Sequence, residues 1–167
     1  LAVSVDKLGG LQNAEGAWSW YKGMEGSRYV TTQVMEMLAR LHSMAGMAMD
    51  GEVRNMYQKG MNYLGAQAGK EYKSMKEAEK KGSTGLRHSE EALRYLYICA
   101  LDGDVAVDKK VNQYFIDKLA GKATELSIYG KALGAIILQQ AGKTAQAKEF
   151  MQSLMEYSVM TDEMGRY

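Results

Sequence analysis

The amino-acid sequence predicts an all-α protein, an α/α toroid-like array of about seven helices in antiparallel hairpins. Apolar residues recur at helical spacing along nearly the whole chain, no convincing alternating strand pattern appears, and the 167 residues include no proline. Short segments containing glycine or aspartate separate the apolar patterns, as is typical of loops between antiparallel helices. The length suits one domain with its own core, so we treat residues 1–167 as a single helical domain or domain fragment.

The first two expected helices flank a segment rich in glycine and aromatic residues. A short helix is expected around residues 6–13, where Leu8 and Leu11 lie at helical spacing. A longer helix is expected over residues 27–47, because six apolar residues share one of its faces. These residues are Val30, Val34, Met37, Leu38, Leu41 and Ala45. Residues 14–26 then form an ordered loop across the end of a helix pair.

Five further helices are expected from their apolar positions. The positions are Val53, Tyr57, Met61, Leu64 and Ala68; Leu93, Leu96, Tyr97 and Ala100; Val107, Val111, Tyr114 or Phe115, and Leu119; Leu126, Tyr129, Leu133, Ile136 and Ile137; and Ala147, Phe150, Met151 and Leu154. Asp50 and Asp104 are expected to cap helix starts. Gly103, Gly121 and Gly142 are expected to follow helix ends.

Composition and charge favour a globular chain. The formal net charge is +1, which gives no electrostatic reason to expect nucleic acid or an anionic membrane as a partner. Lysine and glutamate nearly balance within residues 70–85, which predicts an exposed, solvated helical arm with paired charges. No apolar run reaches membrane-spanning length, so we expect no direct membrane insertion by this segment. Because the sequence begins at Leu1, we interpret it as excised from a larger protein.

The most informative motif is Gln-x-x-x-Gly-x-Trp, formed by Gln12, Gly16 and Trp18 where one helix turns into the next. The Gln12 amide can bond exposed backbone groups at a helix end, and Gly16 permits a left-handed backbone. Trp18 offers a large flat surface for packing. The same spacing occurs in proteins whose paired helices form a closed double ring, and the segment resembles that α/α toroid class.

Motifs for catalysis or metal binding are not found. Cys99 is the single cysteine and lies in an apolar run, which favours a buried, inert thiol. His88 and Cys99 alone are too few for a closed zinc site, and neither histidine belongs to a His-Glu-x-x-His motif. The Gly142-Lys143-Thr144 segment lacks the earlier glycine of a phosphate loop. We therefore expect no enzymatic activity, cofactor or metal.

A family resemblance rests on the opening segment. Leu11, Gln12, Gly16, Trp18 and Trp20, followed by Ser27-Arg28-Tyr29-Val30-Thr31-Thr32, resemble the thioester-domain region of bacterial alpha-2-macroglobulin-like proteins. Residues 127–133 and 138–143 are similar to a late helix hairpin of that region, and residues 165–167 to the turn where the ring continues. The resemblance is specific over residues 8–41 and weaker over residues 50–121.

The resemblance implies a non-catalytic, endopeptidase-inhibitor-like domain of a protease-trapping protein in the bacterial periplasm or cell envelope. Its implied partners are proteases, through the full-length parent protein, and other domains of the same chain. The family thioester joins cysteine and glutamine within Cys-x-Glu-Gln, and Cys99 lacks the required glutamine because Ala100-Leu101-Asp102 follows it. In the family the motif lies upstream of the turn, so no thioester residue is assigned here.

His88 is the one candidate binding residue. Complement relatives place a histidine after the second helix pair, where it assists thioester transfer, and His88 occupies a comparable place in the helix order. A solvated or capping histidine just before a helix is the favoured interpretation of this position, because histidine serves such structural roles readily.

Two alternative functions remain. A terpene-cyclase or prenyltransferase-like enzyme shares the toroid, but this sequence lacks an Asp-rich motif and a full ring. A tetratricopeptide-like interaction module is all-helical, but the expected helices do not repeat at about 34 residues.

Overall fold

A computed structural model describes residues 2–163, and this part contains seven α-helices and no β-strand. The helices are α1 (Ala2–Leu11), α2 (Arg28–Ala45), α3 (Gly51–Lys80), α4 (Glu90–Leu101), α5 (Lys109–Leu119), α6 (Ile128–Gln140) and α7 (Thr144–Glu163). Every helix expected from the apolar pattern is present, so the all-α prediction is confirmed. No helix in this part of the chain is both long and apolar enough to cross a membrane.

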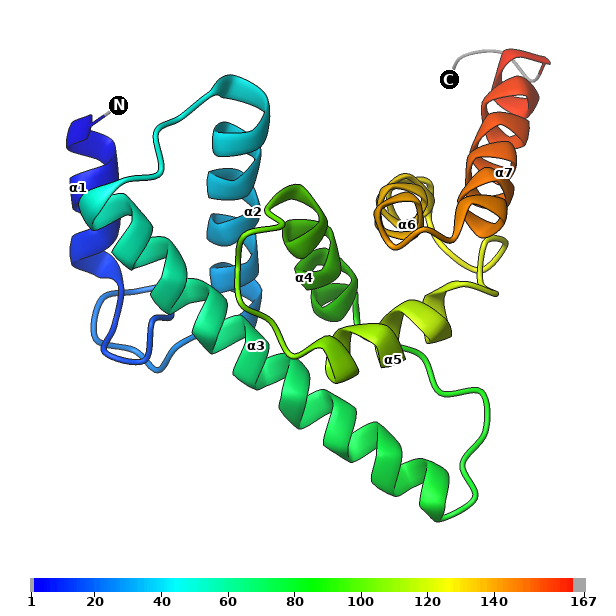
Figure 1. The fold of residues 1–167 in the computed structure, drawn as a ribbon, viewed down its shortest axis with the longest axis horizontal. Helices are drawn as coiled ribbons and strands as arrows, with labels where there is room; N and C mark the ends of the chain where they lie inside the picture. Colours follow the sequence, from blue (N-terminus) through cyan, green and yellow to red (C-terminus); the bar gives the residue numbers. More distant parts are fainter. Residues whose placement is uncertain (1, 164–167) are drawn as a thin grey trace.

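The helices form two rows that alternate along the chain (Figure 1). In one row α4 contacts both α2 and α6, and in the other α3 contacts both α1 and α5. Among the described helices, α7 contacts only α6. Helix α1 lies at one side of the molecule and α7 at the other, so residues 2–163 do not close into a ring (Figure 1).

Side-chain caps define where four of the helices begin. Ser27, Ser89 and Ser127 each accept a hydrogen bond from a backbone N–H in the first turn of the helix that follows. Asp108 accepts two such bonds, from Lys110 and Val111, and so starts α5.

The two aspartate caps expected from the sequence are corrected. Asp104 does not cap a helix, because its backbone N–H donates to Asp102 within a turn and α5 starts only after Asp108. Val105, in between, is buried, and residues 104–107 lie outside the helix. Asp50 does precede α3, but its side chain makes no cap hydrogen bond.

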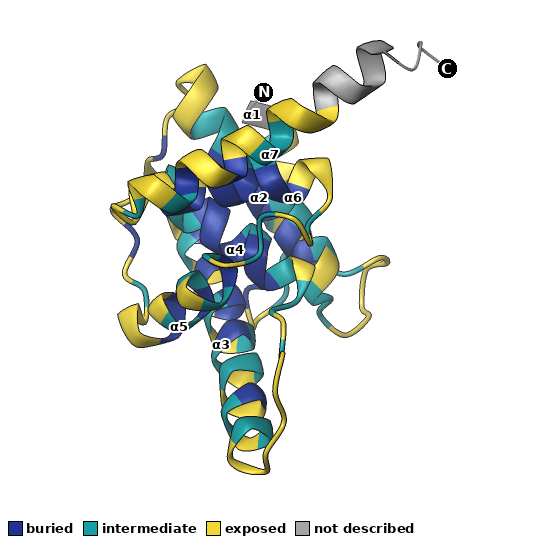
Figure 2. Cartoon of the chain, turned by 90° about the vertical axis from the view of Figure 1, so that its right-hand side faces the viewer, coloured by how far each residue is buried: buried dark blue, intermediate teal, exposed yellow. Residues whose placement is uncertain are grey.

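The core lies between the two rows, and the exposed residues lie on the outer faces and loops (Figure 2). Its largest fully buried apolar side chains are Met35, Leu38, Tyr57, Leu64, Tyr97, Ile98, Phe115, Leu119, Leu138 and Phe150. At the α6–α7 hairpin, a Cβ atom on Gly134 would lie 2.5 Å from the ring of Phe150. Glycine therefore lets α7 approach α6 closely. The turn expected at residues 165–167 falls outside the described residues.

The buried face of α2 differs from the expected one. Its buried residues are Thr31, Thr32, Met35, Glu36, Leu38 and Ala39. Met37, expected in the core, is 46% exposed, and Leu41 is only partly buried. The burial of polar residues has a physical reason, since Thr31 bonds the preceding loop and Glu36 is held by two arginines.

The second half of α3 is less solvated than the sequence indicated. The helix extends to Lys80, as expected, but Met75 is 7% exposed. The Tyr72 ring also packs edge-on against Tyr114 of α5, with 5.0 Å between the ring centroids. Glu79 pairs with Lys118 of α5 at 2.5 Å. The predicted exposed helix with paired charges is present, since Lys73, Glu77 and Lys80 are exposed and Lys76 pairs with Glu79. Its other face is not solvated, because it packs against α5.

Candidate functional site

The Gln-x-x-x-Gly-x-Trp turn is built against α3. Gly16 has a φ of +89°, and a Cβ atom there would lie 2.3 Å from the carbonyl oxygen of Lys59. Only glycine fits both the left-handed backbone and this close approach. The Gln12 side-chain amide donates to the carbonyl oxygens of Gly16 and Met56, each at 2.9 Å. The turn is thus held to the N-terminal third of α3, at Met56 and Lys59.

Trp18 joins the turn to α1 and α2. Its side chain is 3% exposed, and its indole N–H donates to the carbonyl of Leu8 at 2.9 Å. Its backbone N–H donates to Thr31 Oγ1 at 2.9 Å, and its carbonyl accepts from the Ser27 N–H at 2.8 Å. The polar groups of Trp18 are therefore all hydrogen-bonded within the protein. Together with the Gln12 contact to α3, these bonds connect the turn to α1, α2 and α3.

Trp20 has a different environment from Trp18. It is 66% exposed and stacks on Tyr29, with 5.8 Å between the ring centroids. The structure therefore brings Gln12, Gly16 and Trp18 together and leaves Trp20 on the surface.

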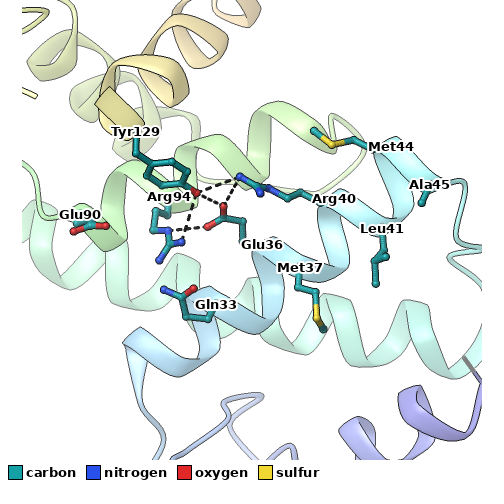
Figure 3. A pocket seen from close by; sticks show the side chains of 10 residues that line it. All are labelled: Gln33, Glu36, Met37, Arg40, Leu41, Met44, Ala45, Glu90, Arg94 and Tyr129. Atoms are coloured by element: carbon teal, nitrogen blue, oxygen red, sulfur yellow. Dashed lines mark hydrogen bonds and ion pairs between the residues drawn. The ribbon is translucent and has the colours of Figure 1, made fainter. Parts of the chain in front are cut away.

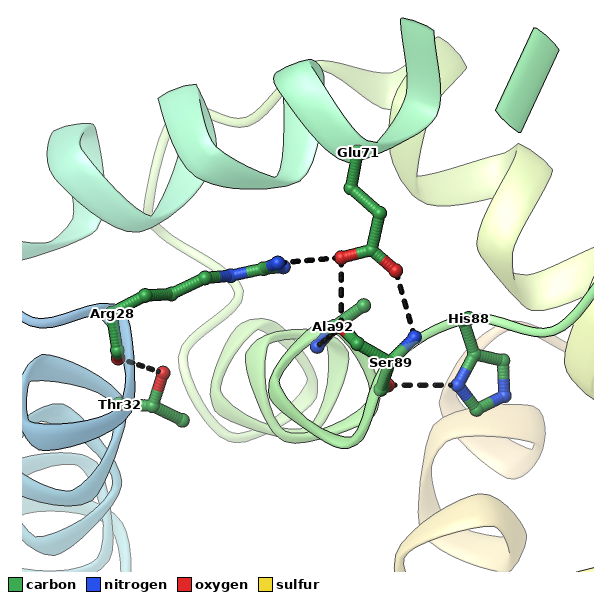
Figure 4. A network of polar contacts seen from close by, with 6 residues as sticks. All are labelled: Arg28, Thr32, Glu71, His88, Ser89 and Ala92. Carbon is green, nitrogen blue, oxygen red and sulfur yellow. Dashed lines mark hydrogen bonds and ion pairs between the residues drawn. The ribbon is translucent and has the colours of Figure 1, made fainter. Parts of the chain in front are cut away.

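His88 lies in the loop before α4, beside a network of polar contacts (Figure 4). Its Nδ1–H donates to the carbonyl oxygen of Ser89 at 3.0 Å. It also lines a crevice of about 40 Å³ together with residues of α5 and the loop after it. The other lining residues are Arg87, Lys118, Lys122, Glu125 and Leu126. His88 is thus a partly buried loop residue that lines the same crevice as the basic side chains of Arg87, Lys118 and Lys122.

The network beside His88 is centred on Glu71 of α3 (Figure 4). Its carboxylate accepts hydrogen bonds from the Ser89 N–H and hydroxyl, each at 2.7 Å, and from Arg28 at 2.6 Å. Burial disfavours the charged form, but these hydrogen bonds outweigh it and lower the pKa of Glu71. One carboxylate therefore links the starts of α2 and α4 to α3.

Cys99 is a partly buried thiol of α4. Burial raises its pKa to about 11, although hydrogen bonds with Tyr95 and Asn112 act in the opposite direction. The thiol is therefore protonated at neutral pH, as the buried-thiol interpretation predicts.

A groove of about 640 Å³ runs between α2, α4 and α6, on the row of even-numbered helices (Figure 3). Its lining residues are Gln33, Glu36, Met37, Arg40, Leu41, Met44 and Ala45 of α2, Glu90 and Arg94 of α4, and Tyr129 of α6. One part of the groove is apolar and the other carries a cluster of charged and hydroxyl groups.

Glu36 is the centre of this charged cluster. It is 4% exposed, and its carboxylate contacts Arg94 Nε at 2.7 Å and Arg40 Nη2 at 3.0 Å. The Tyr129 hydroxyl donates to the same carboxylate and accepts from Arg40 at 3.2 Å. The spacing of Glu36 and Arg40 by four residues was visible in the sequence, but nothing local indicated Arg94 or Tyr129 as partners.

The cluster carries a net positive charge. Burial disfavours the charged forms of Arg40 and Arg94, but attraction to Glu36 and nearby tyrosines outweighs it and raises both pKa values. Burial and the hydrogen bond to Glu36 raise the pKa of Tyr129, so its hydroxyl stays neutral. Two guanidinium groups therefore face one carboxylate, which leaves a formal charge of +1 in the cluster.

Within residues 2–163, no group of three or more His, Cys, Asp and Glu side chains is arranged to hold a metal ion. No family model, curated protein or solved structure matches this chain.

Proposed function

We propose that this chain is a non-catalytic helical domain of a bacterial alpha-2-macroglobulin-like protease-trapping protein of the periplasm or cell envelope. The observation that carries the proposal is the turn at Gln12, Gly16 and Trp18, which resembles that family in sequence and joins α1, α2 and α3. Its polar side chains bind backbone groups of the fold. The motif therefore acts as a packing device, as a structural domain requires.

The order of the helices also supports the proposal. In an α/α toroid, inner and outer helices alternate along the chain. Here α2, α4 and α6 form one row while α1, α3 and α5 form the other. The two rows are compatible with a segment of such a ring, in which other domains of the same protein are the partners of this one.

The test compares the 167-residue chain with the longer natural protein that we propose contains it. Each is incubated with a protease, and the complexes are separated and measured by intact mass. The longer protein is expected to capture the protease, whereas the isolated chain captures none and gains no methylamine adduct. Failure of the longer protein to capture any of several proteases would contradict the proposal.

A second assay addresses the enzymatic alternative. The isolated chain is incubated with an isoprenyl diphosphate and Mg²⁺, and products are followed by mass spectrometry. We expect no turnover. Product formation by the chain would replace the proposed role with that of a toroid enzyme.

A further inference from the structure

We propose that the crevice beside His88 binds a phosphate group, either as the free ion or as the end group of a monoester, through the basic side chains of Arg87, Lys118 and Lys122. This site does not depend on the proposed protease-trapping role. It rests on the charge of the side chains that line the crevice, on the N–H donors that they have left over, and on the small volume of the crevice.

The side chains that line the crevice carry a net positive charge. The charged ones are Arg87, Lys118, Lys122 and Glu125. Three basic groups and one carboxylate give a formal charge of +2 with His88 neutral. Lys118 also pairs with Glu79, but Glu79 pairs in turn with Lys76, so these two residues add one charge of each sign. The neighbouring ion pairs therefore leave the positive charge of the crevice uncompensated.

The crevice also lies where two charged segments meet. Residues 73–88, at the end of α3 and in the loop after it, include five basic and two acidic residues. Residues 117–125, at the end of α5 and in the loop after it, include two of each. Ion pairs join the two segments, between Glu79 and Lys118 and between Arg87 and Glu125. The combined formal charge of the segments is +3, whereas that of the whole chain is +1, so this region attracts anions.

The basic side chains have N–H donors to spare for a ligand. Lys122 Nζ contacts Glu125 at 2.9 Å, and Lys118 Nζ contacts Glu79 at 2.5 Å. Each ammonium group has three donors, so these contacts do not exhaust them. Arg87 contacts Glu125 through Nη2 and has five donors, and its side chain is 61% exposed. Because Arg87 and Lys122 bind the same carboxylate, a ligand with several acceptor oxygens can contact both cations at once.

The charge and the volume of the crevice favour a phosphate group over other anions. A phosphate monoester carries a charge of about −1.5 to −2 at pH 7, so one such group nearly compensates the charge of +2. A carboxylate compensates only half of this charge. The volume of about 40 Å³ is larger than the ~10–15 Å³ that one water molecule requires, but it is too small for an extended segment of polymer. The ligand is therefore a single phosphate group.

The first experiment uses the two histidines of the chain as NMR reporters during a titration with inorganic phosphate. The pH is kept at about 8, where phosphate groups are dianions, and sodium chloride keeps the ionic strength constant. His88 lines the crevice, whereas His42 belongs to α2, which does not line it. We expect a saturable shift of the His88 ring resonances with a Kd of about 1 mM or below, and no shift at His42.

A second titration, with glycerol phosphate, distinguishes the two sources of the phosphate group. Tighter binding of glycerol phosphate than of inorganic phosphate assigns the crevice to a monoester, and the reverse order assigns it to the free ion. Sodium chloride alone should give no saturable shift at either histidine.

Substitutions of the lining residues test the role of charge. Lys122→Gln is expected to weaken binding of inorganic phosphate at least about fivefold, because it removes one charged donor. Lys148→Gln is the matched control, because Lys148 is an exposed lysine of α7 and its substitution changes the net charge equally, so binding should stay unchanged. Glu125→Gln should instead strengthen binding at least about threefold, because it removes the carboxylate from the lining.

Four outcomes would overturn the proposal. They are the absence of a saturable shift at His88, equal shifts of His88 and His42, equal weakening by Lys122→Gln and Lys148→Gln, and weaker binding after Glu125→Gln. Arg87→Gln should weaken binding as Lys122→Gln does. Because the Arg87 side chain is 61% exposed, its substitution tests the crevice even if Lys122→Gln disturbs the fold.

Discussion

At the scale of single residues, the two tryptophans lie two positions apart but have different environments, since Trp18 is buried and Trp20 is exposed. Trp18 fills the space between the loop and α1 and satisfies its indole N–H on Leu8, whereas Trp20 lies on the surface against Tyr29. Burial of a large aromatic ring is a major source of stability, and surface stacking contributes little. The energetic importance of the turn therefore resides in Trp18.

Trp18→Ala is expected to lower the free energy of unfolding by about 3 kcal/mol, because it removes a buried indole and leaves the Leu8 carbonyl without its donor. Trp20→Ala provides the control and should change the free energy of unfolding by less than about 0.5 kcal/mol. Denaturant melts of both variants measure the difference. Equal losses for the two variants would show that the turn is not held by Trp18.

Cys99 provides a second prediction at this scale. With a pKa of about 11, its reactive thiolate form is scarce at pH 8. Alkylation by iodoacetamide in the folded chain should be roughly a hundredfold or more slower than in denaturant, where the thiol has its ordinary pKa. Intact mass against time measures both rates. Similar rates in the folded and denatured chain would contradict the buried environment of the thiol.

At the scale of the helices, polar contacts join elements that apolar packing alone would leave free to shift. Glu71 of α3 binds both the capping serine of α4 and Arg28 at the start of α2 (Figure 4). Glu79, further along α3, binds Lys76 and reaches Lys118 and Tyr114 of α5. These two carboxylates help to position α3 against α2, α4 and α5.

Glu71→Gln is expected to lower the free energy of unfolding by about 1.5 kcal/mol at pH 7, because the substitution removes charge-assisted hydrogen bonds to Ser89 and Arg28. Glu77→Gln is the control, since Glu77 is an exposed residue of the same helix. Urea melts of both variants and the native chain measure the effect.

The effect of Glu71→Gln on the free energy of unfolding is also expected to depend on pH. The pKa of Glu71 is lowered by folding, so its contribution is fully present above the unfolded value and is lost as the pH falls below the ordinary 4.5. The difference in stability between the native chain and Glu71→Gln should therefore stay constant from pH 7 to about 4.5 and shrink as the pH falls further. A difference that stays constant with pH would show that the ionised carboxylate is not the source.

At the scale of the whole molecule, contacts are distributed unequally among the helices. α4 packs against α2, α3, α5 and α6, whereas α7 packs against α6 alone among the described helices. An element with a single neighbour can separate without disturbing the remaining core. The α7 helix should therefore open more readily than α4.

Hydrogen exchange measures this difference directly. Backbone amides of α7 are expected to exchange faster than those of α4, because α7 packs against α6 alone among the described helices, whereas α4 is surrounded by α2, α3, α5 and α6. Phe150→Ala should increase exchange further in α7, since this fully buried ring packs on Gly134 of α6. Equal protection of α4 and α7 in the native chain would contradict the prediction.

The sequence by itself determined the helices and the turn between the first two. Helical periodicity depends on the spacing of apolar residues along one segment, so all seven helices were predictable from local patterns. The roles of Gly16 and Trp18 were also predictable, because a left-handed backbone and a large buried ring are local requirements. The Asp104 cap was predicted wrongly, since a second aspartate, Asp108, competes for the same helix start.

Only the tertiary structure decided which face of α2 is buried and where the charged groove lies. Periodicity identifies an apolar stripe, but not whether another helix covers it, and Met37 and Met44 remain exposed. Glu36 is buried because Arg94 and Tyr129 reach it from other helices, and Tyr129 is 93 positions away in the sequence. A buried charge needs such partners, and folding alone brings them together.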